Sequence, residues 1–174
     1  MTRYLVMSLA LTGLCVLQAQ TENPLSTEVK GSYTNVKNNL LKAADKVSEA
    51  DYAFKATAEV RPFGTLVGHV ADSNLRTCSA INGEAKQGTA SSKTSKADLV
   101  AALKESFAEC DKAYDSLTDA DATKMISMGR MQRSKLGALW GTVVHDNEMY
   151  GTMAVYMRLK GLVPPSTEGR AAGR

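Results

Sequence analysis

The chain of 174 residues carries 21 Lys and Arg against 18 Asp and Glu, a formal net charge of +3 at pH 7. This near balance argues against a nucleic-acid-binding protein, which usually presents a strongly basic face. The length suits one domain with a single hydrophobic core.

The N-terminus has the pattern of a secretory signal peptide. Arg3 precedes an apolar run from Tyr4 to Leu17, and small or polar residues follow it. The run is shorter than the roughly 20 apolar residues of a membrane-spanning helix. We therefore expect residues 1–19 to be removed and the protein to be exported, periplasmic or secreted, with no stable membrane anchor after processing. An uncleaved anchor, or a lipid attached to Cys15, is the alternative.

Apolar residues recur at steps of three and four in four segments, which is the spacing of amphipathic helices. These segments span roughly 26–49, 62–82, 96–117 and 135–160. Pro62 suits the first turn of the second helix, and Gly83 and Gly161 are favoured helix stops. Residues 84–96 have the polar, small-residue composition of a mobile loop that adds nothing to a core, and the region 119–134 is ambiguous.

Four helices without a convincing strand pattern indicate an all-α four-helix bundle. We assign residues 20–167 to this domain and residues 168–174 to a disordered tail. The first helix would be about 36 Å long, and a connector of about 12 residues can span about 40 Å. This connector could therefore run back along the bundle, and the stretch between the third and fourth helices is long enough to do the same. Two such crossovers permit an up-up-down-down order of helices.

Two cysteines, Cys78 and Cys110, remain after the predicted processing, and both lie on apolar faces of predicted helices. A free cysteine in such a place behaves as a small hydrophobic residue, so buried thiols are the favoured interpretation. A disulfide between them is the alternative, because an exported protein meets an oxidising environment.

The last predicted helix is apolar on most of its circumference, as is typical of a buried helix. We expect Trp140 to lie in the core. We also expect the methionines of the C-terminal half to fill irregular gaps in the packing rather than to handle a soft metal. These methionines are Met125, Met128, Met131, Met149, Met153 and Met157.

A polar turn interrupts this helix. It consists of His145, Asp146, Asn147 and Glu148. Successive helical residues point about 100° apart, so at least one of the four must face the interior. An unpaired buried polar group costs about 1–3 kcal/mol, so the turn needs an internal network or a wet cavity. Small residues on the same face (Gly141, Thr142 and Thr152) leave room for a pocket beside the ring of His145, although a structural core histidine is the simpler interpretation.

The other histidine, His69, lies on the second predicted helix, where Asp72 is near enough to orient its ring. Spacing alone does not predict a site shared with His145, because the two residues form no local motif. The sequence also lacks a phosphate-binding glycine loop and the paired cysteines of a zinc finger.

Two stretches of the chain resemble the DinB-like superfamily of helical-bundle metalloproteins. They are RPFGTLVGHVADSNLRTCSAINGE around His69 and HDNEMYGTMAVYMRLKGLVPPS near the C-terminus. The second is the more specific, because the polar turn, Tyr-Gly, Tyr-x-Arg and Gly-x-x-Pro-Pro occur together and in order. The similarity covers roughly residues 25–167. It implies an up-up-down-down four-helix bundle that binds a divalent metal, often zinc or nickel, through one histidine on the second helix and a His-x-x-x-His pair on the last.

His69 and His145 match two of the metal ligands that this resemblance implies, and Met149 stands at the third position. A thioether is a soft and poor ligand for zinc, so the metal site is degenerate. Glu148 is a weak substitute for the missing imidazole, and Met149 would suit copper(I) better than zinc. A metal-free apolar pocket with an ordered water is the alternative.

The resemblance leaves two hypotheses for function. One is a metal-dependent hydrolase or transferase, in which the ion generates a nucleophile near neutral pH. Some relatives are thiol-dependent transferases or isomerases, but such thiols are cytoplasmic, whereas this chain is predicted to be exported. The other hypothesis is a non-catalytic bundle that binds a small molecule or a protein partner and has lost the metal site. A homodimer is compatible with both hypotheses, and nucleic acid is not an expected partner.

Overall fold

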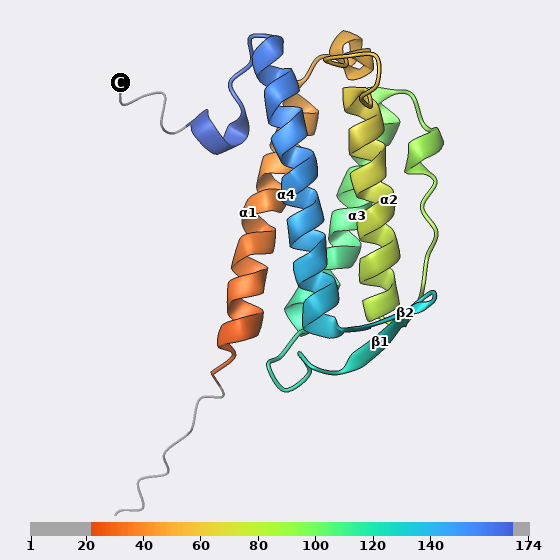
Figure 1. The fold of residues 1–174 in the computed structure, drawn as a ribbon, viewed down its shortest axis with the longest axis vertical. Coiled ribbons are helices and arrows are strands. Elements are labelled where there is room, and N and C mark those ends of the chain that lie inside the picture. The colour runs from red at the N-terminus through yellow and green to blue at the C-terminus, as the bar shows by residue number, and fades with distance from the viewer. Residues whose placement is uncertain (1–21, 169–174) are drawn as a thin grey trace, which may run out of the picture.

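The computed structural model describes residues 22–168, which form a four-helix bundle (Figure 1). The helices are α1 (Pro24–Lys46), α2 (Phe63–Ile81), α3 (Lys96–Ser116) and α4 (Lys135–Leu159). Three short 3-10 segments lie between or after them: η1 (Glu49–Ala53), η2 (Ala90–Ser92) and η3 (Pro165–Thr167). The all-α bundle expected from the sequence is confirmed. The predicted signal peptide and nearly all of the predicted tail lie outside the described residues.

Local signals explain where these helices begin and end. The hydroxyl of Ser95 accepts a hydrogen bond from the amide of Asp98, and the hydroxyl of Ser134 accepts one from the amide of Gly137. These are N-terminal caps, which satisfy amide groups that have no partner inside the helix. Gly161 has a φ of 73° just after α4, a backbone conformation that favours glycine. Within residues 22–168, no helix is long and apolar enough to cross a lipid bilayer.

The helices follow one another in the order up, down, down, up, so the predicted up-up-down-down order was wrong. α2 and α3 run parallel, α1 is antiparallel to α3, and α4 is antiparallel to α2 (Figure 1). Gly68 lies near Leu99, and Cys78 lies near Cys110, so α2 and α3 run in the same direction. Ser26 contacts Asp119, and Asp45 contacts Lys96, so α1 and α3 run in opposite directions. Arg61 contacts Tyr156, and His69 contacts His145, so α2 and α4 also run in opposite directions.

The first connector folds over one end of the bundle instead of running back along it. Tyr52 in η1 is buried, and its hydroxyl donates a hydrogen bond to the carbonyl of Ala44 at the end of α1. The amide of Phe63 donates to the carbonyl of Phe54, which starts α2 at the same end of the bundle. Connector length permitted a crossover here, but these aromatic contacts decide against it.

The crossover lies instead between α2 and α3, in residues 82–95, which run along the outside of α2 (Figure 1). The carboxylate of Asp72 accepts hydrogen bonds from the amides of Ala90 and Ser91. Ala90 is buried, and its carbonyl oxygen would lie 2.9 Å from a Cβ placed on Gly68. The expectation that this segment adds nothing to the core was therefore wrong, because Ala90 packs against a glycine that makes room for it.

Cys78 and Cys110 form a disulfide between α2 and α3, with their Cα atoms 4.8 Å apart. Both residues are fully buried, as the apolar helix faces predicted. The favoured expectation of free thiols was wrong. Only the parallel packing of α2 on α3 places the two cysteines opposite each other, and the sequence pattern does not contain that information.

A two-stranded antiparallel hairpin occupies the region that the sequence left ambiguous. Strand β1 (Met125–Met128) pairs with β2 (Met131–Ser134), and the turn between them begins at Gly129, which has a φ of 64°. The hairpin contacts α2 through β1 and leads directly into α4 through β2. It therefore lies across the end of the α2–α4 groove (Figure 1).

The outer face of α4 corrects two expectations about burial. Trp140 is 51% exposed rather than in the core. Met149, Met153 and Met157 are buried as packing residues, but Met125 and Met131 on the hairpin are exposed. Because α4 is apolar on nearly all sides, its sequence could not indicate which face the bundle covers.

Candidate metal and ligand-binding site

The two histidines of the chain meet between α2 and α4. His69 comes from α2 and His145 from α4, and their Nε2 atoms lie 3.1 Å apart. Their ring centroids are 5.0 Å apart, and the ring planes are inclined at 63°. Both residues are partly buried. The antiparallel packing of the two helices thus brings together residues that are 76 positions apart in the sequence.

The proton positions on these rings follow from their neighbours. Nδ1 of His145 lies 3.4 Å from Oδ1 of Asp146, and this favours the tautomer in which Nδ1 carries the hydrogen. Nε2 of His145 then presents a lone pair toward His69. Nε2 of His69 can either donate a hydrogen bond to that lone pair or present a second lone pair to a shared ion.

Asp146 anchors this arrangement from inside the bundle. Its side chain is fully buried, and Oδ2 accepts a hydrogen bond of 3.0 Å from Nδ2 of Asn74. Burial raises the pKa of Asp146, while the hydrogen bonds with His145 and Asn74 act in the opposite direction. The other amide atom of Asn74, Oδ1, is buried without a hydrogen-bond partner among the described residues.

The polar turn of α4 divides between the interior and the solvent. Asp146 points inward and His145 is partly buried, whereas Asn147 and Glu148 are exposed. The sequence required at least one buried member but did not identify Asp146 as that member. The position of Asp146 directly after His145 is the sequence feature that could have identified it, because a carboxylate there can reach a nitrogen of the histidine ring.

The protonation of His69 is set by its surroundings. Burial lowers the pKa of His69, and electrostatic interactions with the neighbouring His145, Arg61 and Arg76 lower it further. The ring is therefore neutral at neutral pH and keeps a lone pair. Asp72, which we expected to orient His69, uses its oxygens to hold the amides of Ala90 and Ser91 instead.

The position that would supply a third ligand holds no imidazole. Met149 lies one helical turn after His145 and is only 9% exposed. Glu148 is exposed to solvent. Within residues 22–168, no group of three or more His, Cys, Asp or Glu side chains is placed to hold a metal ion. The candidate donor set is therefore the histidine pair alone.

The spacing of the two Nε2 atoms is compatible with two ligands of one metal ion. Two imidazole nitrogens 3.1 Å apart lie within reach of one zinc ion, whose bonds to histidine nitrogen are about 2.0–2.1 Å long. Met149 does not complete this set, because a thioether is a poor donor for zinc. Water or a bound molecule would occupy the other coordination positions of such an ion.

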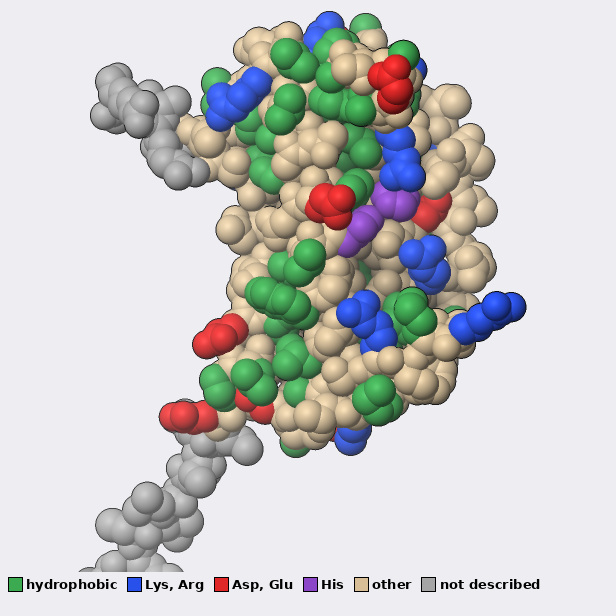
Figure 2. All heavy atoms as spheres, viewed as in Figure 1, with side chains coloured by type: hydrophobic (Ala, Val, Ile, Leu, Met, Phe, Trp, Pro, Cys, Tyr) green, Lys and Arg blue, Asp and Glu red, His purple; other side chains and the backbone are tan. Residues whose placement is uncertain are grey.

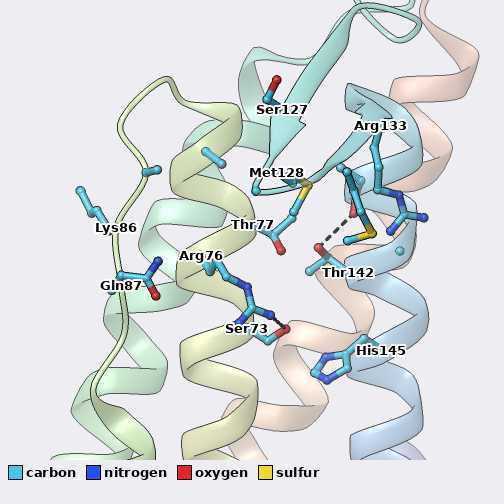
Figure 3. A pocket seen from close by; sticks show the side chains of 16 residues that line it. Ser73, Arg76, Thr77, Lys86, Gln87, Ser127, Met128, Arg133, Thr142 and His145 are labelled. Carbon is cyan, nitrogen blue, oxygen red and sulfur yellow. Dashed lines mark hydrogen bonds between the residues drawn. The ribbon is translucent and has the colours of Figure 1, made fainter.

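A cavity of about 400 Å³ lies beside His145, between α2, α4, the hairpin and the segment that follows α2 (Figure 3). Gly141 and Thr142 line it together with His145, as their small side chains predicted, but Thr152 does not line it. Arg76 and Arg133 also line it, and no local pattern in the sequence marks either residue. Figure 2 shows Lys and Arg side chains on the hairpin side of the two histidines.

Comparison with known proteins identifies the family. The model of the DinB superfamily matches residues 32–153, which is more than half of the chain. The chain belongs to the DinB superfamily. Among solved structures, this DinB protein is similar to a DinB-like protein from Bacillus cereus ATCC 10987, with a TM-score of 0.66 and 18% identity over 80% of this chain and 95% of that one.

This DinB protein is also similar to a conserved protein from Enterococcus faecalis, with a TM-score of 0.62 and 14% identity over 81% of this chain and 98% of that one. At such identities these likenesses show the fold alone. A search of curated proteins found no match. The superfamily and the helical bundle are therefore established.

Proposed function

We propose that this DinB protein binds a divalent metal ion, zinc or nickel, through Nε2 of His69 and His145. The metal would serve hydrolase or transferase chemistry on a small molecule held in the adjoining cavity. The observation that carries the proposal is the 3.1 Å separation of the two Nε2 atoms. Two imidazoles at this spacing, on different helices, form a preorganised pair of ligands.

The surrounding residues have defined parts in this proposal. Asp146 orients the ring of His145 from the buried side, as carboxylates do for many metal-binding histidines. Asn74 holds the carboxylate of Asp146 from α2. A bound divalent ion would lower the pKa of a coordinated water or polarise a bound substrate. The cavity would hold that substrate and limit its orientations.

A second candidate function rests on Met149. In this alternative the protein is a non-catalytic helical bundle that binds a ligand, and His69 and His145 form a hydrogen bond with each other without a metal. The buried thioether at the third position is the observation that favours it. The two candidates share the cavity and differ only in whether an ion lies at the histidine pair.

Metal titration separates the two candidates. Metal-free protein would be titrated with zinc and with nickel by calorimetry, next to His69→Ala and His145→Ala. One ion per chain in the wild type, lost in both variants, is the expected result. Met149→His should bind roughly tenfold more tightly or better, because it adds a third imidazole at helical spacing.

A matched control places the same imidazole elsewhere on α4. Val144 is exposed on the outer face, so Val144→His should leave the metal affinity unchanged. If the wild type binds no ion while Met149→His does, the metal-dependent function is wrong and the binding bundle is correct.

We also propose that the protein is exported. The disulfide between Cys78 and Cys110 supports this, because such bonds persist mainly in oxidising compartments. The test is the N-terminal mass of the protein recovered from its native cells. Loss of about 19 residues supports export, and an intact N-terminus in a cytosolic fraction contradicts it.

A further inference from the structure

The cavity beside His145 carries charge of only one sign. Its charged lining consists of Arg76, Lys86 and Arg133, and no Asp or Glu side chain lines it. Lys86 forms an ion pair of 3.0 Å with Glu109, which lies outside the cavity. The two arginines are therefore the cations available to a ligand.

Neither arginine forms an ion pair within the part of the chain that the structure describes. Arg76 donates only a long hydrogen bond of 3.5 Å to the hydroxyl of Ser73. The guanidinium of Arg133 lies against Gly141, where a Cβ would come within 3.1 Å of Nη1. The glycine thus gives Arg133 room to lie along α4 at the cavity.

The two guanidinium groups approach the cavity from different elements. Figure 3 shows Arg76 on the α2 side and Arg133 on the β2 side, with His145 at the lower end of the same space. A guanidinium presents parallel N–H groups that match the paired oxygens of a carboxylate or a phosphate. Both guanidinium groups line the same cavity, so both attract an oxyanion to it.

The remaining lining is mostly apolar or hydroxyl-bearing, together with the amide of Gln87 and the ring of His145. Met128, Met131 and Ala138 supply apolar surface, and Thr77 and Thr142 supply hydroxyl groups. The volume of about 400 Å³ lies within the range of small-molecule sites, about 300–1,000 Å³. Such a lining suits a molecule with one anionic end and one apolar end.

We propose that the cavity binds a small organic oxyanion, a carboxylate or a phosphate ester. Its charged group pairs with Arg76 and Arg133, and its apolar part lies against Met128 and Met131 beside His145. This inference names the ligand class of the site proposed above, and it rests on that cavity being the working site. Carboxylates and phosphate esters share the paired oxygens that the arginines recognise.

The test uses phenylacetate, phenyl phosphate and neutral phenylacetamide as probes, titrated by calorimetry into the purified protein with EDTA present. Both anions, or one of them, should bind at least tenfold more tightly than the amide. The affinity should fall as the salt concentration rises from about 20 to about 200 mM, because salt screens the arginine charges. The tighter of the two anions identifies the source as a carboxylate or a phosphate ester.

Charge-removing variants locate the site. Arg76→Gln and Arg133→Gln should each weaken anion binding roughly tenfold, the effect of losing one charged hydrogen-bonding partner. Arg130→Gln is the matched control, since Arg130 lies in the same hairpin and does not line the cavity. The control should bind as the wild type does.

Three outcomes would overturn the inference. They are equal binding of the amide and the anions, equal behaviour of all three arginine variants, and no saturable binding of either anion up to about 10 mM. Because EDTA is present, anion binding is measured without a metal. His69→Ala should lose the metal and keep the anion, so a failure of the metal proposal is distinguishable from a failure of this one.

Discussion

Removal of the disulfide between α2 and α3 should strongly destabilise the fold. The bond joins residues 32 positions apart, and closing such a loop lowers the entropy of the unfolded chain by about 12 cal/mol/K. This corresponds to about 3.7 kcal/mol at 25 °C. The double variant Cys78→Ala, Cys110→Ala also loses two buried sulfur atoms, which adds about 1 kcal/mol.

Urea unfolding followed by far-UV circular dichroism measures this effect. With a slope of about 2 kcal/mol/M, a loss of 4–5 kcal/mol lowers the midpoint by about 2 M. The wild type titrated in a strong reductant is the control, because it loses the bond and keeps both sulfur atoms. Its urea midpoint should lie between those of the oxidised wild type and the double variant.

Two results would refute this reasoning. One is a double variant whose free energy of unfolding lies within about 1 kcal/mol of the oxidised wild type. The other is labelling of both Cys78 and Cys110 by a thiol reagent in protein that has been denatured without a reductant, because that would show that the bond is not formed.

Two further predictions concern stability. Gly31→Ala should stabilise the protein by about 0.5–1 kcal/mol, because a Cβ there meets nothing within 4 Å. Gly68→Ala should destabilise it, because the Cβ would lie 2.9 Å from the carbonyl oxygen of Ala90. Thermal melts of both variants check this, and equal shifts of the melting temperature would contradict it. Hydrogen bonds from Asn82, Lys86 and Lys112 lower the pKa of Glu109 to about 2 from 4.5, so its carboxylate stabilises the fold fully above about pH 4.5 and loses that effect as the pH falls toward 2. In urea titrations, Glu109→Gln should therefore lower the free energy of unfolding by roughly 1–3 kcal/mol at pH 7 and by almost nothing near pH 2. The control Glu105→Gln, at an exposed position of the same helix, should lower it by less than about 0.5 kcal/mol at either pH. A loss of stability in Glu109→Gln that does not change with pH would count against this role of Glu109.

The helices and part of the site could be predicted from the sequence. Apolar spacing placed α4 at 135–160, and the structure has it at Lys135–Leu159. The polar turn in α4 indicated a pocket beside His145, and Gly141 and Thr142 line that cavity. These features depend on residues within one helix, so a local pattern contains them.

The contacts between helices could not be predicted in the same way. Connector length allowed either helix order, and the burial of Tyr52 over the bundle end decided it. Arg133 became a candidate ligand-binding residue only because the hairpin carries it to α4 beside Gly141.

The sequence by itself determined four helices, a histidine on each of two of them, and a methionine one turn after the second histidine. Tertiary structure alone decided that His69 and His145 would meet with their Nε2 atoms 3.1 Å apart, and that Cys78 would bond to Cys110. The physical reason is the separation along the sequence between the residues that interact. Helix formation depends on neighbours three and four residues away, whereas the site depends on the direction in which α2 packs against α3 and α4.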